Sequence, residues 1–113
     1  MTTQTIAVVG ANGFIGSRLV EMLHLEGVAS VRPVVRRASA LASAARFALE
    51  GHVADALDTS ALRDALAGCD AVVHCVAGDA KTIVKSAAAV YTAADAVGCR
   101  RLVYLSSACV HGQ

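Results

Sequence analysis

The sequence predicts an α/β fold in which helices cover both faces of a doubly wound parallel sheet. Strand-like apolar runs alternate with helical patterns along the 113 residues, as in consecutive β-α-β units. The apolar runs are continuous rather than alternating with polar residues, which is typical of strands that are buried on both faces. Because parallel strands are joined by right-handed crossovers, we expect the strand order 3-2-1-4-5 in one domain spanning residues 1–113.

The individual elements follow from apolar spacing and from the residues that start and stop them. The expected strands are Thr5–Val9, Val31–Val35, a weak strand between Arg46 and Ala54, Ala71–Val76 and Arg101–Ser106. The expected helices are 13–26, 58–68 including an aspartate cap and a glycine stop, and 80–97, with a short helix or loop over 39–45. Gly27 and Gly98 are suitable C-terminal stops for the first and last of these helices.

Pro33 is unusual inside a strand, because proline has no N–H to donate to a sheet ladder. We therefore expect its side of the strand to face a short or frayed third strand.

Composition excludes several classes of protein. The net charge of +1 gives no reason to expect a nucleic-acid partner or a membrane surface. No apolar stretch approaches the roughly 20 residues of a membrane span, and the start of the chain has no basic region of a secretion signal.

The cysteines and histidines indicate no metal site. The four cysteines, at positions 69, 75, 99 and 109, include no Cys-x-x-Cys pair, and the histidines at 24, 52, 74 and 111 are scattered. Cys75 and Cys109 lie in apolar segments, where cysteine behaves as a small hydrophobic residue. We expect buried, reduced thiols in a cytoplasmic protein.

A glycine-rich turn directly follows the first strand and leads into the first helix. Gly10 can make the tight turn, Gly13 lets backbone N–H groups approach a pyrophosphate, and Gly16 lets the helix lie close to the strand. The first helical turn adds unpaired N–H donors and the positive end of the helix dipole. The pattern predicts a nucleotide site; the alternative is a purely structural turn.

The second strand is followed by Arg36 and Arg37 rather than by an acidic residue. An acid at about this distance from the glycines usually accepts from the 2′-hydroxyl of NAD, whereas a guanidinium suits the 2′-phosphate of NADP. Arg32 and Arg46 add positive charge nearby in the sequence. We expect NADP to be preferred, with NAD possible; the alternative is that the two arginines are solvated loop charges.

Three segments in this order, 10–16, 67–74 and 101–112, resemble the short-chain dehydrogenase/reductase superfamily, on its extended or atypical side with the NAD-dependent epimerase/dehydratases. The resemblance covers essentially the whole chain and implies a Rossmann-type sheet. Carried over by motif, the cofactor-binding residues are Gly10, Gly13, Phe14, Ile15 and Gly16 around the pyrophosphate, Arg36 and Arg37 at the 2′-phosphate, His52 and Val53 at adenine, and Val76, Ala77 and Gly78 at the nicotinamide-side ribose.

Ser107 matches the active-site serine of this superfamily and would hydrogen-bond a substrate carbonyl or hydroxyl while a hydride moves. The alternative is that Ser106 and Ser107 only close a strand end. His52 stands where the superfamily commonly has an aspartate, although Asp55 lies close by, and His111 replaces a usual tyrosine.

The tyrosine and lysine that provide general acid–base chemistry in the superfamily, spaced four residues apart, are missing. Tyr91 is followed at that spacing by Asp95, and Tyr104 by Ala108. We therefore expect the chain to represent the cofactor-binding half of a longer enzyme, with the sheet truncated after the fifth strand and the substrate lobe absent.

The resulting hypothesis is an NAD(P)-dependent oxidoreductase or epimerase/dehydratase acting by hydride transfer on a small carbonyl, alcohol or nucleotide-sugar-like substrate. The fragment alone would be inactive. The alternative functions are a non-catalytic NADP(H)-binding regulator that senses redox state, and a relative in fold alone. The superfamily also suggests a homodimer packed through helix 80–97, whose alanines would equally suit packing on the sheet.

Overall fold

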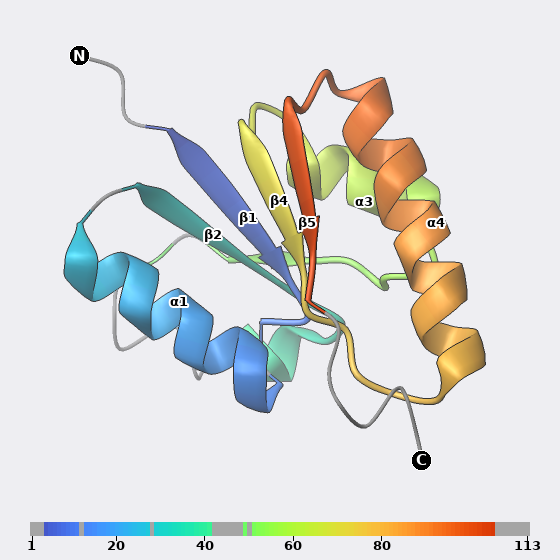
Figure 1. Ribbon diagram of the computed structural model, residues 1–113, viewed down its shortest axis with the longest axis horizontal. Coiled ribbons are helices and arrows are strands. Elements are labelled where there is room, and N and C mark those ends of the chain that lie inside the picture. Colours follow the sequence, from blue (N-terminus) through green and yellow to red (C-terminus); the bar gives the residue numbers. More distant parts are fainter. Residues whose placement is uncertain (1–3, 12, 28, 42–48, 50, 106–113) are drawn as a thin grey trace.

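The computed structural model describes residues 4–11, 13–27, 29–41, 49 and 51–105, which form one sheet with helices on both faces (Figure 1). The strands are β1 (Thr5–Val9), β2 (Ser30–Val35), β3 (His52–Val53), β4 (Ala71–His74) and β5 (Arg101–Tyr104). The helices are α1 (Phe14–Glu26), the 3₁₀ helix η1 (Ala38–Leu41), α3 (Thr59–Leu66) and α4 (Ala80–Ala96). No helix among the described residues is long and apolar enough to cross a membrane.

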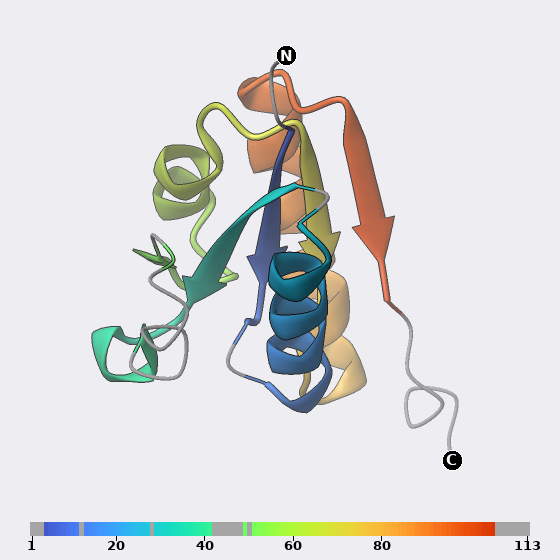
Figure 2. The same cartoon turned by 90° about the vertical axis from the view of Figure 1, so that its left-hand side faces the viewer.

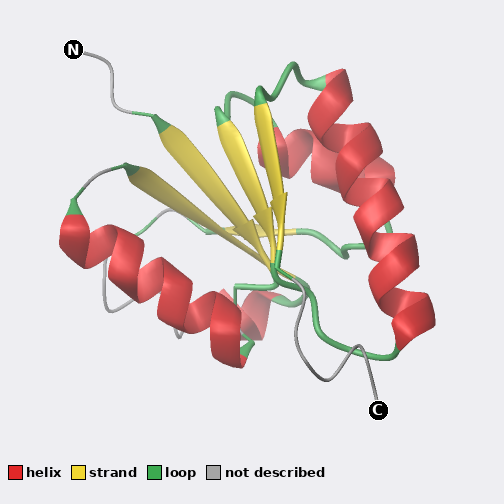
Figure 3. Cartoon of the chain, in the orientation of Figure 1, coloured by secondary structure: helices red, strands yellow, loops and turns green. Residues whose placement is uncertain are grey.

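All strand pairs are parallel, and the order across the sheet is β3-β2-β1-β4-β5. The predicted class and strand order are therefore confirmed. The chain passes from β1 to β2 on one side and later to β4 on the other, so the direction of winding reverses beside β1. In Figure 3 all the strands point the same way, so their carboxyl ends lie along one edge of the sheet, and sheets of this kind bind ligands outside that edge.

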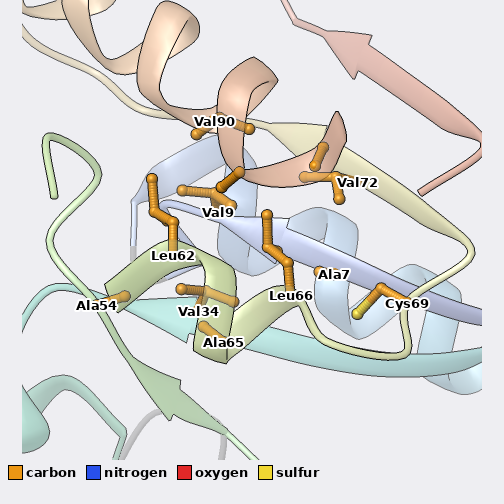
Figure 4. Packing of buried hydrophobic residues seen from close by; sticks show 12 residues of the cluster. Ala7, Val9, Val34, Ala54, Leu62, Ala65, Leu66, Cys69, Val72 and Val90 are labelled. Atoms are coloured by element: carbon orange, nitrogen blue, oxygen red, sulfur yellow. The ribbon is translucent and has the colours of Figure 1, made fainter. Parts of the chain in front are cut away.

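The continuous apolar character of β1 is explained by burial on both faces of the sheet. Ala7, Val8 and Val9 are at most 1% exposed, although consecutive strand residues point to opposite faces. α1 covers one face, and α3 and α4 cover the other (Figure 2). Leu62 and Leu66 of α3 are fully buried in the larger of the two cores (Figure 4).

Pro33 lies in β2 with its ring nitrogen on the β3 side of the ladder. Ser30 donates to the Gln4 carbonyl beside β1, and the Val34 carbonyl also accepts on the β1 side, whereas the Val35 carbonyl accepts from Ala54 on the β3 side. Because neighbouring strand residues bond in alternate directions, Pro33 shares the β3 side with Val35. β3 pairs only with Val34 and Val35, so the expectation of a short third strand beside Pro33 is confirmed.

The ends of the elements differ from the sequence-based expectation by a few residues. β4 ends at His74 rather than Val76, because its neighbour β1 ends at Val9, the partner of His74. Cys75 still donates its N–H to the Val9 carbonyl. β5 is described to Tyr104, and the expected end at Ser106 lies outside the described residues.

The start of α3 provides a test of the predicted aspartate cap. The Asp58 carboxylate accepts from the Ala61 N–H at 3.1 Å. Asp58→Ala is expected to lower the free energy of unfolding by about 0.5–2 kcal/mol, because one N–H of the first turn loses its partner. Asp58→Asn keeps an acceptor oxygen and is the matched control in urea denaturation. Equal stabilities of the two variants would contradict the capping role.

Candidate functional site

The turn between β1 and α1 is closed by two glycines that leave no room for a side chain. Gly10 has φ of +84°, and a Cβ there would lie 2.9 Å from the carbonyl carbon and oxygen of Cys75. A Cβ on Gly16, in the first turn of α1, would overlap the Gly10 carbonyl oxygen. The backbone of β1, the loop and α1 can therefore approach one another only because both positions lack side chains.

The backbone amides of this turn divide into two groups. Gly10 and Ala11 donate to the Val34 carbonyl at 3.0 and 3.2 Å, and Gly13 donates to the Gly10 carbonyl at 3.1 Å. These amides bond within the protein, whereas the sequence led us to expect N–H groups around Gly13 to approach a pyrophosphate. Among the described residues of the turn and helix start, those whose amides remain for a ligand are 14–16, because the first N–H groups of a helix have no carbonyl one turn earlier.

α1 also differs from the other α-helices of the described chain in its cap. Asp58 caps α3, and Asp79 caps α4 by accepting from the Thr82 N–H at 2.7 Å. That hydrogen bond lowers the pKa of the Asp79 carboxyl group. The cap of α1 is Gly13, which has no side chain, and the first turn of α1 contains no acidic residue. The positive end of its dipole is therefore left for an external anion.

A cavity of about 480 Å³ lies beside this helix start, at the carboxyl ends of β1, β2 and β4. It is lined by Val9, Gly10, Gly13, Val34, Arg36, Ala54, Asp55, Ala56, Leu57, Cys75, Val76, Ala77, Thr82 and Ser86. Its size falls within the range of small-molecule sites, and its place is the point where the winding of the sheet reverses.

The end of the cavity next to β2 and β3 contains charged groups of both signs. Arg36 directly follows β2, and its Nε lies 3.6 Å from Oδ2 of Asp55, which comes from the segment after β3. Arg32 does not contribute to this end: its Nη1 donates to the carbonyls of Ala65 and Ala67 at 2.9 and 2.7 Å. Arg32 thus binds the C-terminal end of α3, where cations are favoured.

The other end of the cavity is bordered by the chain after β4 and by the inner face of α4. Thr82 and Ser86, one helical turn apart on α4, line it together with Val76 and Ala77. The Ser86 hydroxyl lies 2.8 Å from Nε2 of His74, and both side chains are at most 2% exposed. Burial lowers the pKa of the His74 imidazole, so the ring is neutral at neutral pH.

Cys75 lines the cavity with a buried thiol. Burial raises the pKa of its thiol to about 11, so the reactive thiolate is not populated at neutral pH. Within the described residues Cys69, Cys75 and Cys99 are free thiols, and no three metal-ligating side chains come together.

The structure brings together some of the cofactor-binding residues expected from sequence. Those that line the cavity are Gly10, Gly13, Arg36, Val76 and Ala77. Those that do not line it are Phe14, Ile15, Gly16, Arg37, His52, Val53 and Gly78. Phe14 and Ile15 have exposed side chains, and Gly16 is buried at the turn; all three belong to the first turn of α1. Ser107 and Arg46 lie outside the described residues.

The two residues expected at adenine lie directly before the segment that lines the cavity. His52 and Val53 form β3, whereas the cavity is lined by the next four residues, 54–57. The carboxyl ends of strands surround such a crevice, so the residues after β3 could have been chosen once β3 was placed. Thr82 and Ser86 were also missed; their signal is two hydroxyl residues one turn apart on a helix with an apolar inner face.

These features fit a dinucleotide, since the turn has no room for a Cβ on Gly10 or Gly16 and the uncapped helix adjoins the cavity. Comparison with known proteins agrees. The family model described as NAD(P)H-binding matches residues 10–113. Cinnamoyl-CoA reductase 1 of Oryza sativa subsp. japonica is 36% identical in an alignment of 117 positions that covers 92% of this chain and 34% of the relative. The corresponding protein of Petunia hybrida is 37% identical over 92% of the chain and 35% of the relative.

Solved structures are similar over the same region. A nucleoside-diphosphate-sugar epimerase from Pseudomonas aeruginosa has a TM-score of 0.81 and 25% identity, covering 95% of this chain and 34% of that protein. An NADPH-dependent quinone oxidoreductase from Escherichia coli, complexed with NADPH, has a TM-score of 0.78 and 25% identity over 88% and 35%. The chain thus spans about a third of the length of the relatives it matches.

These neighbours confirm the resemblance to the short-chain dehydrogenase/reductase superfamily and its epimerase and reductase branch. The family match covers nearly the whole chain and includes the glycine turn, the cavity and the segments around β4 and β5. The protein belongs to the NAD(P)H-binding family, of whose longer members it corresponds to the cofactor-binding part.

Proposed function

We propose that the protein is the cofactor-binding part of an NAD(P)-dependent oxidoreductase or epimerase/dehydratase that prefers NADP. The observation that carries the proposal is the cavity beside the uncapped start of α1, where two glycines leave no space for a Cβ. The cofactor, when bound, supplies or accepts the hydride. The residues of this chain hold it and shape the space around it.

The cavity and the adjoining start of α1 have proposed roles. The amides of Phe14, Ile15 and Gly16 bind the pyrophosphate, since the helix start offers both donors and positive potential. Arg36 binds the adenosine 2′-phosphate, because a guanidinium donates two parallel hydrogen bonds to such a group. Val76 and Ala77 border the nicotinamide-side ribose.

Residues beyond the cavity lining retain proposed roles from the superfamily. Ser107 hydrogen-bonds a substrate carbonyl or hydroxyl and so positions it for hydride transfer. Gly78 borders the nicotinamide-side ribose beside Val76 and Ala77, and its φ of +144° is a backbone conformation that favours glycine. The reductases and the epimerase among the relatives support hydride chemistry on a small organic substrate, which we propose for the whole protein.

The cofactor preference is tested by measuring dissociation constants for NADPH and NADH by titration calorimetry. We expect NADPH to bind more tightly, and Arg36→Met to weaken NADPH binding about tenfold while changing NADH binding less than about twofold, because a charge-assisted contact to phosphate is lost. Arg63→Met removes an exposed arginine of α3 outside the cavity and is the control. Equal loss for both cofactors would refute the role of Arg36.

The hydride chemistry is tested on the protein encoded by the whole reading frame. NADPH consumption is followed by absorbance with aldehyde, ketone and quinone substrates. Consumption with any of these supports an oxidoreductase. An epimerase or dehydratase returns the hydride within each turnover, so conversion of nucleotide-sugar substrates is followed as well by product analysis. Binding of NADPH with neither net consumption nor product formation would instead favour a cofactor-binding regulator.

A further inference from the structure

The Arg36 side chain shares its end of the cavity with a carboxylate. Its Nε lies 3.6 Å from Oδ2 of Asp55, and both residues line the cavity. The two side chains are 69% and 44% exposed, so the ion pair is solvated and easily exchanged for another partner of the guanidinium.

The carboxylate is the fixed member of this pair. Oδ1 of Asp55 accepts from the Leu57 N–H at 2.9 Å, and its carbonyl oxygen accepts from the Asp58 N–H at 2.9 Å. The residue before it, Ala54, donates its N–H to the Val35 carbonyl of β2 at 2.8 Å. Asp55 is thus held by a turn that is tied to the strand carrying Arg36, whereas the arginine side chain is long and exposed.

The geometry points to Asp55 as a residue that determines cofactor selectivity, an inference that rests on the proposed function. In dinucleotide folds an acid after the second strand usually serves the ribose 2′-hydroxyl. Here we infer that the acid is supplied after β3 instead, next to an arginine after β2. Asp55 holds the guanidinium and repels a 2′-phosphate, while its carboxylate can accept from a 2′-hydroxyl. It therefore reduces the preference for NADPH over NADH that Arg36 alone would give.

The charges set the size of the effect. An anion that contacts the Arg36 guanidinium must lie within several ångströms of the Asp55 carboxylate, in a region open to solvent. Coulomb's law at such separations in water gives about a three- to tenfold change in the dissociation constant of a doubly charged phosphate. The effect should decrease as salt is added.

The test compares the wild type with Asp55→Asn, which removes the charge but keeps an Oδ1 acceptor for the Leu57 amide. Dissociation constants for NADPH and NADH are measured by calorimetry at low and high salt. We expect NADPH to bind about three- to tenfold more tightly to the variant and NADH to bind equally or more weakly. Asp64→Asn, which removes an exposed acid of α3 outside the cavity, should change neither constant.

Two further measurements separate the possible causes of failure. Thermal unfolding establishes that Asp55→Asn is folded, and Asp55→Ser, which also offers an acceptor to Leu57, replaces it if it is not. In the Arg36→Met background, Asp55→Asn should increase NADPH affinity less than it does in the wild type. Without the guanidinium, Asp55 no longer competes with the phosphate for Arg36. Suppose that the wild type binds both cofactors and that the ratio of its NADPH and NADH dissociation constants changes less than twofold in Asp55→Asn. The inference about Asp55 then fails and the proposed function stands. If the wild type binds neither cofactor, both fail.

Discussion

Gly16→Ala is expected to abolish dinucleotide binding and to lower the free energy of unfolding by about 3 kcal/mol, the upper end for an overpacked site. The added Cβ would overlap the Gly10 carbonyl oxygen and lie 3.1 Å from the Cα of Ala11. These are backbone atoms, which cannot rotate away as a side chain can. The helix start must therefore separate from the turn that precedes it.

Gly10 is not free to move in response. Its N–H donates to the Val34 carbonyl, its carbonyl accepts from the Gly13 N–H, and the space beside its Cα is occupied by the Cys75 backbone. Any shift of Gly10 breaks one of these contacts. Separation of the helix from the turn displaces the amides of the first turn of α1, so cofactor binding is lost together with stability.

Gly13→Ala is the matched control, because a Cβ on Gly13 meets its nearest atom at 3.5 Å and the backbone there is extended. It should cost less than about 1 kcal/mol, the difference between glycine and alanine at a helix cap. Stability is measured by urea denaturation and binding by calorimetry. Wild-type stability of Gly16→Ala would show that the turn is more adaptable than the packing implies.

The contrast between these glycines shows which parts of the protein could be read from the sequence. Gly10 and Gly16 act through local backbone geometry between adjacent elements, so their spacing in the sequence was sufficient to predict the tight turn and the close approach of the helix. The same holds for the strand order, which follows from crossover handedness, and for Pro33, whose missing N–H predicted the short neighbouring strand.

Contacts between segments distant in sequence could not be read in the same way. The pairing of Arg36 with Asp55 depends on how far β3 extends, and β3 has only two residues, too few to give a pattern. Arg32 appeared to belong with the other arginines, yet alternation along β2 points it to the end of α3. Proximity in sequence was misleading there because Arg32 lies near the amino end of β2 and Arg36 follows its carboxyl end, and four extended residues span about 13 Å.

The buried pair of His74 and Ser86 is a third contact of this kind, and it joins β4 to α4. The Ser86 hydroxyl also lies 3.0 Å from the Ile83 carbonyl. A serine hydroxyl has one hydrogen, so when it is donated to Ile83 the imidazole Nε2–H donates to Oγ. The Tyr104 ring of β5 lies 5.5 Å from the His74 ring and covers it. The imidazole Nε2 and the Ser86 hydroxyl thus have hydrogen-bond partners within the protein.

Ser86→Ala is expected to lower the free energy of unfolding by about 1–3 kcal/mol, because the buried Nε2–H loses its acceptor. The better helix propensity of alanine offsets about 0.5 kcal/mol of this loss. Thr92→Ala is the matched control: its hydroxyl donates to the Ala88 carbonyl on the exposed side of the same helix. Thr92→Ala should be nearly neutral, and a Ser86→Ala variant equally neutral would mean that His74 finds another acceptor.

The same pair predicts how stability depends on pH. Because burial lowers the pKa of His74 in the folded protein below its ordinary value of 6.5, the unfolded chain binds the proton more tightly. The contribution of neutral His74 is therefore complete above about pH 6.5 and is lost as the pH falls towards the folded pKa, with a slope of up to about 1.4 kcal/mol per unit. His74→Gln removes the titrating group, so the fall in unfolding free energy from pH 7.5 to 5.5 should be shallower in this variant than in the wild type. A steeper or equal fall in the variant would mean that His74 is protonated in the folded protein and that its bond to Ser86 survives the added charge.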